Sequence, residues 1–437
     1  MRPMESLQTR SPWPALVLFM AAFFLRLFLA PGLGPFPKDV EVGVMYGTYG
    51  AEHGVTKLPD LFTERNWPVM YPPLFIYQAA AIGKIGANRL AALEKNYPDV
   101  AATWLRIRYK LLPIIYDMLT GILILLVLAK FVAPPWPLLG ATFYLLNPCV
   151  VIDSAAWGHL DSIHSFFIAL TAVCLGMTCG PRQDRWLVGA WLMFALAVCT
   201  KLQSIVMIPL LGVITLRRRN VAVAVAGVAI FALTVLTLYS PFLLAQRWDY
   251  FDFVFVRSFT EGRFTQINAF NFWGLGYVAP STDKILGIIS CAHLGQLASA
   301  ICTLWLCYWL LKDGGAQTKK DEALRSLVVA GAFACVMPFM LLTQMRERYI
   351  APAIPLLVLA ACLDRRLLGV CAGFSLTYTL NLLHVQRHIF GGPEEMAVVN
   401  ASNFALRVFG CLLNIGLFAW FTYRLPVLVR SRLSSTA

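Results

Sequence analysis

Charged residues are scarce in this chain. Asp, Glu, Lys and Arg make up 14% of its 437 residues, whereas 59% of the residues are hydrophobic. Soluble domains carry about 25% charged residues, so this composition excludes an ordinary soluble protein. The alternating segments of about ten residues that mark a membrane β-barrel are also lacking. Since most apolar runs approach the ~20 residues that a spanning helix needs, the sequence predicts an all-α integral membrane protein, a polytopic helical bundle.

The signatures of several other function classes are missing. No CxxC or Cys/His spacing of a metal site occurs, and most of the 11 cysteines lie inside apolar runs, where they act as small buried hydrophobic residues. No glycine-rich signature of a dinucleotide-binding fold is present. No strong internal repeat is visible, which argues against a secondary transporter. No metal and no cofactor is therefore expected.

The net charge of +13 raises the question of nucleic-acid binding. The basic residues do not form one soluble basic face, and many lie in short loops between apolar runs, such as residues 217–219 and 319–320. Short cytoplasmic loops of membrane proteins retain Lys and Arg. The charge therefore indicates topology, and the expected partner is the lipid bilayer, with no nucleic acid.

The apolar runs define the expected membrane topology. The first run is predicted to be a retained anchor that starts inside, because no clear cleavage site follows it. Counting the runs gives twelve spans within an expected range of about 10–13. The runs are residues 13–30, 111–130, 138–152, 163–179, 186–199, 205–216, 221–244, 285–311, 326–343, 350–363, 367–383 and 404–423.

One domain, residues 1–437, is predicted to carry two large extracytoplasmic loops, residues 31–108 and 246–281. The first loop is the longest polar segment, with a possible helix at residues 40–50 and an apolar stretch at 72–87 that is expected to lie along the interface. With this topology, the polar clusters of the chain fall on the outer face. These clusters contain Lys38, Asp39, Glu41, Asn147, Trp157, His159, Asp161, Lys201, Gln203, Asn268, Asn271, Arg346, Glu347, Arg348 and Tyr349.

These residue types suit an anionic substrate held in a membrane. Arg offers a planar fork to phosphate, Lys offers a point charge, and a carboxylate can take a proton from a hydroxyl group. The residues alone leave simpler readings open. Asp39 can be a solvated loop carboxylate, Arg346 and Arg348 can reach lipid headgroups, and Asn268 and Asn271 can be turn residues.

Two ionisable residues, Arg26 and Asp117, lie inside predicted spans. Ionisable side chains within a membrane are costly and are usually functional or paired. The sequence therefore predicts that they form a structural pair near the outer boundary.

The polar motifs follow one another in a recognisable order over roughly residues 20–360. In chain order they are Arg26, Asp39, Tyr71-Pro72-Pro73, Asn147-Pro148, Trp157-Gly158-His159-Leu160-Asp161, Lys201-Leu202-Gln203, Asn268-Ala269-Phe270-Asn271 and Arg346-Glu347-Arg348-Tyr349. This order resembles that of bacterial glycosyltransferases of the GT-C superfamily that are related to the second mannosyltransferase of GPI-anchor assembly. Two positions depart from that pattern, because His159 stands where it has Gln and Arg346 where it has His.

The resemblance implies a GT-C fold and an inverting transfer of a sugar, and the family that the chain resembles points to mannose as this sugar. The donor would be a polyprenyl-phosphate sugar and the acceptor an extracytoplasmic glycan, lipid or protein. Asp39 would be the catalytic base that deprotonates the acceptor hydroxyl. The implied substrate-binding residues are Glu41, Tyr71, His159, Asp161, Lys201, Gln203, Asn268, Asn271, Arg346, Glu347 and Arg348.

The resemblance also implies an active site on the extracytoplasmic face of a bacterial plasma membrane, or of the endoplasmic reticulum in a eukaryote. Two other classes of function stay open. A transporter or flippase of a lipid-linked glycan would line a path through the membrane with polar groups, and a non-catalytic assembly subunit would tolerate substitutions around Asp39.

Overall fold

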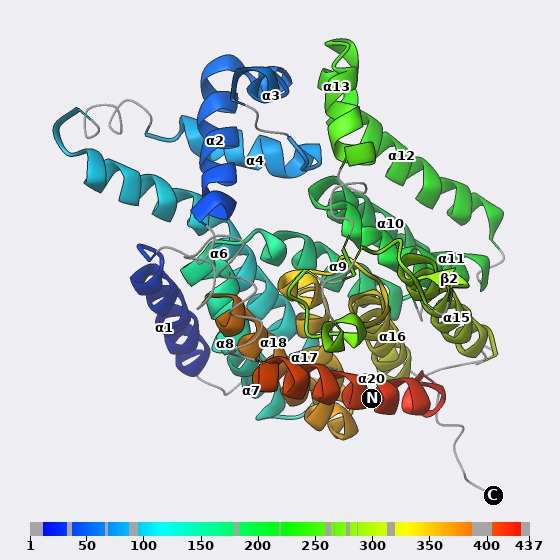
Figure 1. Ribbon diagram of the computed structural model, residues 1–437. Coiled ribbons are helices and arrows are strands. Elements are labelled where there is room, and N and C mark those ends of the chain that lie inside the picture. Colours follow the sequence, from blue (N-terminus) through cyan, green and yellow to red (C-terminus); the bar gives the residue numbers. More distant parts are fainter. Residues whose placement is uncertain are drawn as a thin grey trace, which may run out of the picture.

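The structure is a computed structural model, and it is almost entirely helical (Figure 1). It describes residues 12–32, 37–65, 69–86, 95–178, 183–217, 220–257, 264–265, 267–276, 280–285, 287–312, 320–386 and 404–429. The helices are α1 (Trp13–Leu29), α2 (Pro37–His53), η2 (Val55–Lys57), α3 (Asp60–Arg65), α4 (Pro73–Lys84), α6 (Pro98–Phe131), α7 (Trp136–Leu145), α8 (Pro148–Val151), η3 (Ile152–Trp157), α9 (Asp161–Gly176), α10 (Gln183–Thr200), η4 (Leu202–Met207), α11 (Ile208–Arg217), α12 (Val221–Leu244), α13 (Trp248–Phe251), η5 (Asp252–Arg257), η6 (Phe272–Leu275), α15 (Cys291–Lys312), α16 (Lys320–Leu341), η7 (Glu347–Ile350), α17 (Ala353–Leu363), η8 (Arg365–Leu367), α18 (Leu368–Gln386) and α20 (Phe404–Val429). The strands are β1 (Lys284–Ile285) and β2 (Ile289–Ser290), which pair antiparallel as a small hairpin.

Each of the twelve predicted spans contains a described helical segment, although the span 285–311 begins in the β-hairpin and becomes helical only at Cys291, and the prediction of an all-α membrane protein is confirmed. The predicted span 221–244 and helix α12 have the same limits. Within the described ranges, six helices are long and apolar enough to cross a membrane, or seven if a pair bent by 44° counts as one span. The six are Pro98–Phe131, Val221–Leu244, Cys291–Lys312, Lys320–Leu341, Arg365–Val385 and Phe404–Val429.

Six or seven is fewer than the twelve predicted runs, because the other runs form shorter or interrupted helices. The bent pair shows the cause. Helix α7 ends at Leu145, the Asn147 side chain accepts a hydrogen bond from the Cys149 amide, and Pro148 starts the next helix. A proline lacks the N–H that would continue the preceding helix, so the chain bends at this point. These interruptions matter for function, since they put polar residues at helix ends.

The predicted first outer loop is mostly helical. It contains α2, which extends the predicted helix 40–50 in both directions, and α4, which covers most of the apolar stretch 72–87. The 34-residue helix α6 already begins at Pro98, so residues 98–108 of the predicted loop are the first turns of this helix. The segment 312–325 between two predicted spans is likewise partly helical, because α16 begins at Lys320.

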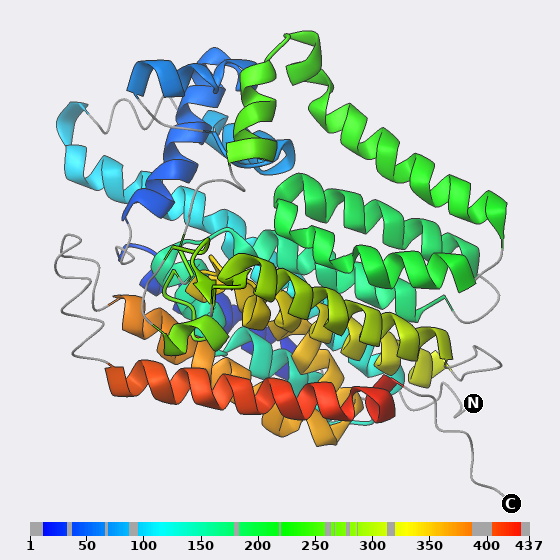
Figure 2. The ribbon, with the colours of Figure 1, turned by 45° about the vertical axis from the view of Figure 1, so that its right-hand side comes forward.

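The two predicted outer loops lie side by side. Figures 1 and 2 show α2, α3 and α4 next to α13 on one side of the helical bundle. An ion pair joins them, with Arg247 Nη2 2.7 Å from Asp60 Oδ1, and the Tyr250 hydroxyl donates to the Tyr71 carbonyl at 2.9 Å. The segment α2–α4 and the helix α13 therefore lie in one layer on the same side of the bundle.

Helix α16 lies in the centre of the bundle, in contact with α9, α17 and α20. Its packing on α9 is close, since a Cβ atom at Gly176 would come within 2.7 Å of the Leu324 Cα. Such a close approach needs glycine at that position. This contact fixes α9 against the helix that leads to η7.

The predicted pairing of Arg26 with Asp117 is confirmed. Arg26 Nε donates to Asp117 Oδ2 at 3.0 Å, and both side chains are fully buried. Arg26 Nη1 also donates to the Leu145 carbonyl at 2.8 Å, and the Tyr144 hydroxyl donates to Asp117 Oδ1 at 3.2 Å. The pair ties α1 to α6 and α7.

We expect this pair to show the thermodynamics of a buried ion pair. Removal of one partner leaves an uncompensated charge, which costs about 3–5 kcal/mol, whereas an apolar replacement of both partners is often neutral. Arg26→Leu and Asp117→Leu should each lower the midpoint of thermal unfolding in detergent, and the double variant should lie closer to the wild type. A double variant less stable than both single variants would contradict this interpretation.

Candidate active site

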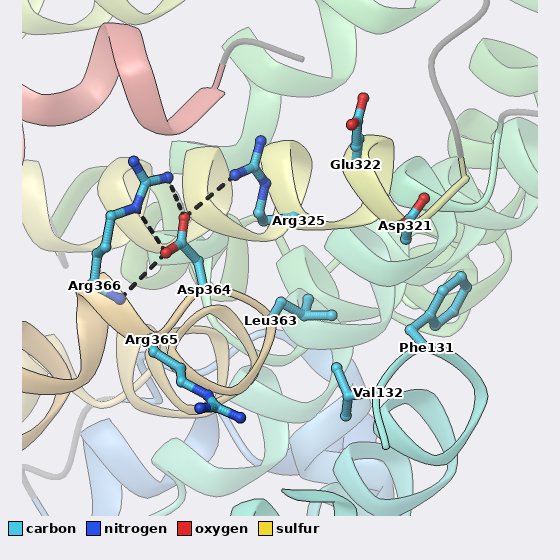
Figure 3. Close-up of a pocket in the computed structure, with 9 residues that line it drawn as sticks. All are labelled: Phe131, Val132, Asp321, Glu322, Arg325, Leu363, Asp364, Arg365 and Arg366. Atoms are coloured by element: carbon cyan, nitrogen blue, oxygen red, sulfur yellow. Dashed lines mark hydrogen bonds and ion pairs between the residues drawn. The ribbon is translucent and has the colours of Figure 1, made fainter. Parts of the chain in front are cut away.

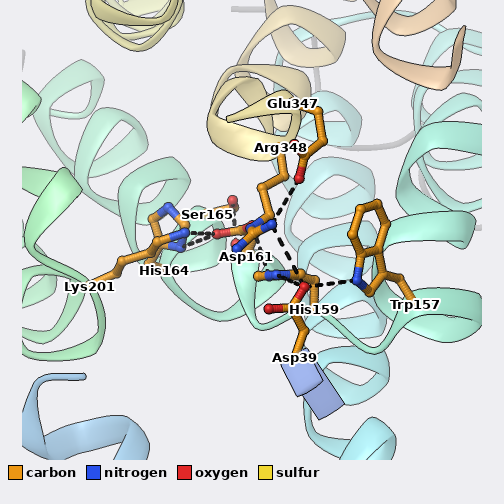
Figure 4. Close-up of polar contacts among 9 residues, drawn as sticks. All are labelled: Asp39, Trp157, His159, Asp161, His164, Ser165, Lys201, Glu347 and Arg348. Atoms are coloured by element: carbon orange, nitrogen blue, oxygen red, sulfur yellow. Dashed lines mark hydrogen bonds and ion pairs between the residues drawn. The ribbon is translucent and has the colours of Figure 1, made fainter. Parts of the chain in front are cut away.

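Five of the predicted site residues meet in one cluster, although they come from four separate parts of the chain (Figure 4). The cluster forms at helix ends. One member lies in the first turn of α2, two flank the start of α9, one follows the last residue of α10, and one lies in η7. The members are Asp39, His159, Asp161, Lys201 and Arg348.

The turn between η3 and α9 aims His159 into the cluster. Gly158 adopts a left-handed conformation with φ +84°, which favours glycine. A Cβ atom there would also meet the Lys110 side chain at 2.7 Å. The Lys110 ammonium donates to the carbonyls of Gly32 and Ala156 at 2.7 and 2.8 Å. Lys110 therefore fastens the turn to the segment that precedes α2.

Three described side chains face Asp39, and all three lie near the same carboxylate oxygen, Oδ2. Trp157 Nε1 donates to Oδ2 at 3.0 Å, His159 Nε2 lies 3.5 Å from Oδ2, and Arg348 Nη1 lies 3.8 Å from it. None of these three groups takes Oδ1, and 20% of the side chain is exposed. These three groups therefore hold Asp39 by its Oδ2 atom.

The same neighbours decide the charge of Asp39. Burial works to raise the pKa of its carboxyl group, but the positive charges of Arg348 and His159 outweigh burial and hold the pKa well below its ordinary value. Arg346 lowers it further. Asp39 is therefore ionised at neutral pH.

Asp161 is the buried carboxylate at the centre of the cluster, with 1% of its side chain exposed. Lys201 binds its Oδ1. Its Oδ2 lies 3.1 Å from His159 Nδ1 and 3.8 Å from Arg348 Nε. His164 Nδ1 lies 3.6 Å from Oδ1, the oxygen that Lys201 also binds. A buried carboxylate is tolerated only with such compensation.

Arg348 lies between the carboxylates of Asp39 and Asp161, and it also pairs with a third carboxylate, that of Glu347. Its Nη1 donates to Glu347 Oε1 at 2.8 Å, and only 5% of the Arg348 side chain is exposed. Burial works to lower the pKa of Arg348, but Asp39, Glu347 and Asp161 raise it well above its ordinary value. A side chain buried in this way does not extend to lipid headgroups, so that alternative does not fit Arg348.

Two further predicted residues lie beside the cluster. The Tyr71 side chain is half-buried, and burial raises the pKa of its hydroxyl, which also experiences the charges of Arg348 and Asp39. Arg346 is half-buried, and its backbone forms bridges to Ile267 and Asn268. These bridges join η7 to the predicted second outer loop.

The remaining predicted residues have other surroundings. Glu41 is exposed on α2. Gln203 lies in η4, and its Oε1 is buried without a hydrogen-bond partner among the described residues. The carbonyl of Asn268 accepts a hydrogen bond from the Asn381 side chain at 2.7 Å.

Asn271 has hydrogen bonds within the protein. Its side chain accepts from the Gly274 amide at 3.1 Å and donates to the Phe339 carbonyl at 3.0 Å. The residue is fully buried. It therefore caps η6 and holds this segment against α16.

Asp153, Trp157 and His164 are the polar neighbours that the sequence-based site lacks. The indole N–H of Trp157 donates a hydrogen bond to Asp39 and so fixes its position. Asp153 is buried in η3, and its Oδ1 has no hydrogen-bond partner in the described ranges. The signal for Asp153 was available, because an acidic residue at the end of an apolar run is unusual.

Asp153, His159 and Asp161 each place a ligand-type atom within 4.8 Å of the others. Two carboxylates and an imidazole are ligands that divalent metals accept. However, Lys201 binds Asp161, and Arg348 lies 3.8 Å from the same carboxylate. These cations already compensate the carboxylate, and their charge opposes a further cation.

A separate hollow of about 460 Å³ lies at the start of α16 (Figure 3). Its Asp364 is bound by Arg366 and lies 3.3 Å from Arg325, and Arg365 stacks on Trp136. The 22-residue α16 rises about 33 Å, which separates this hollow from η7. The hollow is therefore not part of the cluster.

Comparison with known proteins identifies the family. Residues 160–378 match the family described as ALG3 protein, a match that covers half of the chain. The chain belongs to the ALG3 family. ALG3 proteins are a family of GT-C mannosyltransferases, so this chain is a glycosyltransferase of the GT-C type, as its motifs predict. The ALG3 match includes Asp161, Lys201 and Arg348, and it begins just after His159.

Two solved structures are similar to the ALG3-family chain. One is ArnT from Cupriavidus metallidurans bound to undecaprenyl phosphate, with a TM-score of 0.49, 12% identity, and coverage of 96% of this chain and 78% of ArnT. The other is the same ArnT in the apo state, with a TM-score of 0.48, 14% identity, and coverage of 95% and 77%. No curated protein sequence matches the chain.

Proposed function

We propose that this ALG3-family protein transfers mannose from a polyprenyl-phosphate donor to a hydroxyl group of an extracytoplasmic glycan, lipid or protein, with inversion at the anomeric carbon. The observation that carries the proposal is the meeting of an ionised, partly accessible Asp39 with the buried cation Arg348. An acceptor that must lose a proton and a donor that must release a phosphate need these two groups.

Each group has one part of the reaction. Asp39 Oδ1 takes the proton of the acceptor hydroxyl while the acceptor oxygen bonds to the anomeric carbon. The bond from this carbon to the phosphate oxygen breaks, and its electron pair stays with the phosphate. Arg348, assisted by Lys201 or His159, stabilises this growing negative charge. The scheme uses no metal and no cofactor.

The proposed binding residues divide into two groups. Tyr71, Arg346 and Glu347 border the cluster and are proposed to contact the sugar or the phosphate. Glu41, Gln203, Asn268 and Asn271 are proposed contacts only through the family pattern. We expect them to contribute less to transfer.

A donor panel tests the function. Purified protein would receive polyprenyl-phosphate mannose, the matching glucose donor, and nucleotide-linked mannose, each with membrane extract as acceptor. We expect transfer from the mannosyl lipid alone. Transfer from the nucleotide sugar would overturn the proposal, and movement of a lipid-linked glycan across vesicles without any transfer would favour a flippase.

The proposed active site faces the extracytoplasmic side, with residues 31–108 as the catalytic loop and 246–281 as the second loop of a single domain. The basic short loops support this orientation. The membrane would be a bacterial plasma membrane, or the endoplasmic reticulum in a eukaryote.

Cysteine labelling tests the orientation. Glu52 is exposed near the end of α2, and Asp321 is exposed at the start of α16. In intact cells, Glu52→Cys should react with an impermeant maleimide, and Asp321→Cys should react only after permeabilisation. Wild-type protein measures the background from native cysteines, and reporter fusions after residues 219 and 320 should score cytoplasmic. The reverse labelling pattern would place Asp39 on the wrong side for the proposed donor.

A further inference from the structure

His159 lies between two carboxylates that face its two ring nitrogens. Nε2 is 3.5 Å from Asp39 Oδ2, and Nδ1 is 3.1 Å from Asp161 Oδ2. A neutral imidazole carries one N–H and one lone pair, so it can satisfy only one of these carboxylates. An imidazolium carries two N–H groups and satisfies both. Two carboxylates that face the two ring nitrogens therefore favour the charged form of His159.

Other charged or titratable groups around His159 come from several elements, including Lys110 of α6, which packs against the neighbouring Gly158. Arg348 of η7 is the opposing cation, and Lys201 and His164 act through Asp161. Asp153 of η3 places a carboxylate oxygen within 4.8 Å of a His159 ring nitrogen. Burial and Arg348 work to lower the pKa of His159, but Asp161 and Asp39 outweigh them and raise it above its ordinary value.

We propose that His159 is a positioning residue that acts only as an imidazolium, and that loss of its proton releases the phosphate of the donor. This inference rests on the proposed function. While charged, His159 holds Asp39 by Oδ2 and keeps Oδ1 directed to the acceptor. When neutral, it turns a lone pair toward one carboxylate, and the site loses one positive charge beside Arg348.

The protonation of His159 makes donor affinity depend on pH. Below its pKa His159 is charged, and anion binding is favoured. As the pH rises through this pKa the charge is lost, and in the limit donor affinity falls about tenfold per pH unit. The motif pattern that this chain resembles, that of relatives of the GPI-anchor second mannosyltransferase, has Gln at this position, an amide that does not titrate. This chain therefore differs from that pattern by a pH-dependent site.

The probe has to keep a constant charge. A free polyprenyl phosphate is a monoester whose second pKa is about 6, so its own titration would obscure the result. Polyprenyl-phosphate mannose is a phosphodiester and carries one negative charge throughout. Its affinity would be measured between about pH 6 and pH 9, a range that begins near the ordinary histidine pKa and extends above it.

We expect the wild-type protein to lose donor affinity as the pH rises, by tenfold or more over this range, and His159→Gln to bind more weakly at low pH with a flat profile. His53→Gln is the matched control, because His53 is exposed at the end of α2, stacked on Tyr49, and outside the cluster. It should keep the wild-type profile. A His159→Gln protein with the same falling curve as the wild type would overturn the inference.

A second measurement separates this inference from the proposed function. If the wild-type protein does not bind the donor at any pH, the proposed function fails. The state of His159 is then read from ¹⁵N-labelled histidine side chains, by the difference between wild type and His159→Gln spectra. An imidazolium that loses its proton above the ordinary histidine pKa supports the charged bridge. A neutral ring at pH 7 would refute the inference.

Discussion

Asp39→Asn is expected to slow sugar transfer by about 10²–10⁴-fold, the usual contribution of a general base. The substitution removes the proton acceptor with little change of shape, and it also removes the negative charge that faces Arg348 and His159. The Asn side-chain oxygen can still accept the hydrogen bond that Trp157 Nε1 donates to Asp39 at 3.0 Å. Initial rates at saturating polyprenyl-phosphate mannose measure the effect, and thermal unfolding measures the stability that is lost with the charge of Asp39.

Glu41→Gln is the matched control for this substitution. Glu41 lies two residues further along α2 and is exposed, so its side chain does not point into the cluster. We expect at most a mild loss of rate. A purified Asp39→Asn protein that transfers mannose at the wild-type rate would remove Asp39 from the mechanism.

The low pKa of Asp39 is compatible with the role of a base. Burial raises this pKa, and Arg348 and His159 lower it by a larger amount. A donor phosphate bound to Arg348 would offset part of that positive charge, and the pKa of Asp39 would rise toward its ordinary value. The same anion that fills the site therefore makes Asp39 a stronger base, and the proton transfer is coupled to donor binding.

Periodicity and hydropathy predict the helices of this fold well but predict their ends poorly. The limits of α12 agree with the apolar run, because that run ends in polar residues on both sides. Helix α6 begins well before its apolar run, at Pro98. The sequence could not show this, because Arg108 and Lys110 in its early turns donate to the carbonyls of Gly83 and Gly32, which come from distant segments.

In the candidate site, too, some features follow from the sequence and others depend on contacts with distant segments. The polar motifs of the sequence include Asp39, Asp161 and Arg348, and the structure places Arg348 3.8 Å from each of the two carboxylates. The contribution of Trp157 could not be predicted, because it depends on the π-helical turn η3 and on the left-handed Gly158. The internal hydrogen bonds of Asn271 depend on the approach of α16, which the local sequence does not contain.

Arg348 is the residue whose substitution should reduce donor use most. Loss of one group that stabilises developing negative charge typically lowers the rate about 10²–10³-fold. Arg348→Ala would show this loss, but its stability would fall as well. Glu347 and Asp161 each have about 1% exposure, and removal of a partner from a buried ion pair costs about 3–5 kcal/mol. Arg348 is therefore packed and paired, unlike an outer Arg that reaches lipid headgroups.

Arg348→Lys is the sharper variant, because it keeps the charge and removes the planar fork. In the wild type, Arg348 Nη1 donates a hydrogen bond to Glu347 and lies near Asp39, while Arg348 Nε faces Asp161. A single ammonium cannot reproduce these separated donors. We expect the Lys variant to retain most of the thermal stability, to need more donor for half-maximal rate, and to turn over more slowly.

Arg247→Lys provides the matched control for an arginine in an ion pair outside the cluster. Arg247 binds Asp60 and Asp249 with two of its nitrogens, so the substitution disturbs a comparable fork. We expect no change in the donor concentration for half-maximal rate. If Arg348→Lys also keeps the wild-type rate and donor requirement, the fork serves only to compensate Asp161 and Glu347. The phosphate would then have to be bound by Lys201 and His159, which is a different site from the one proposed.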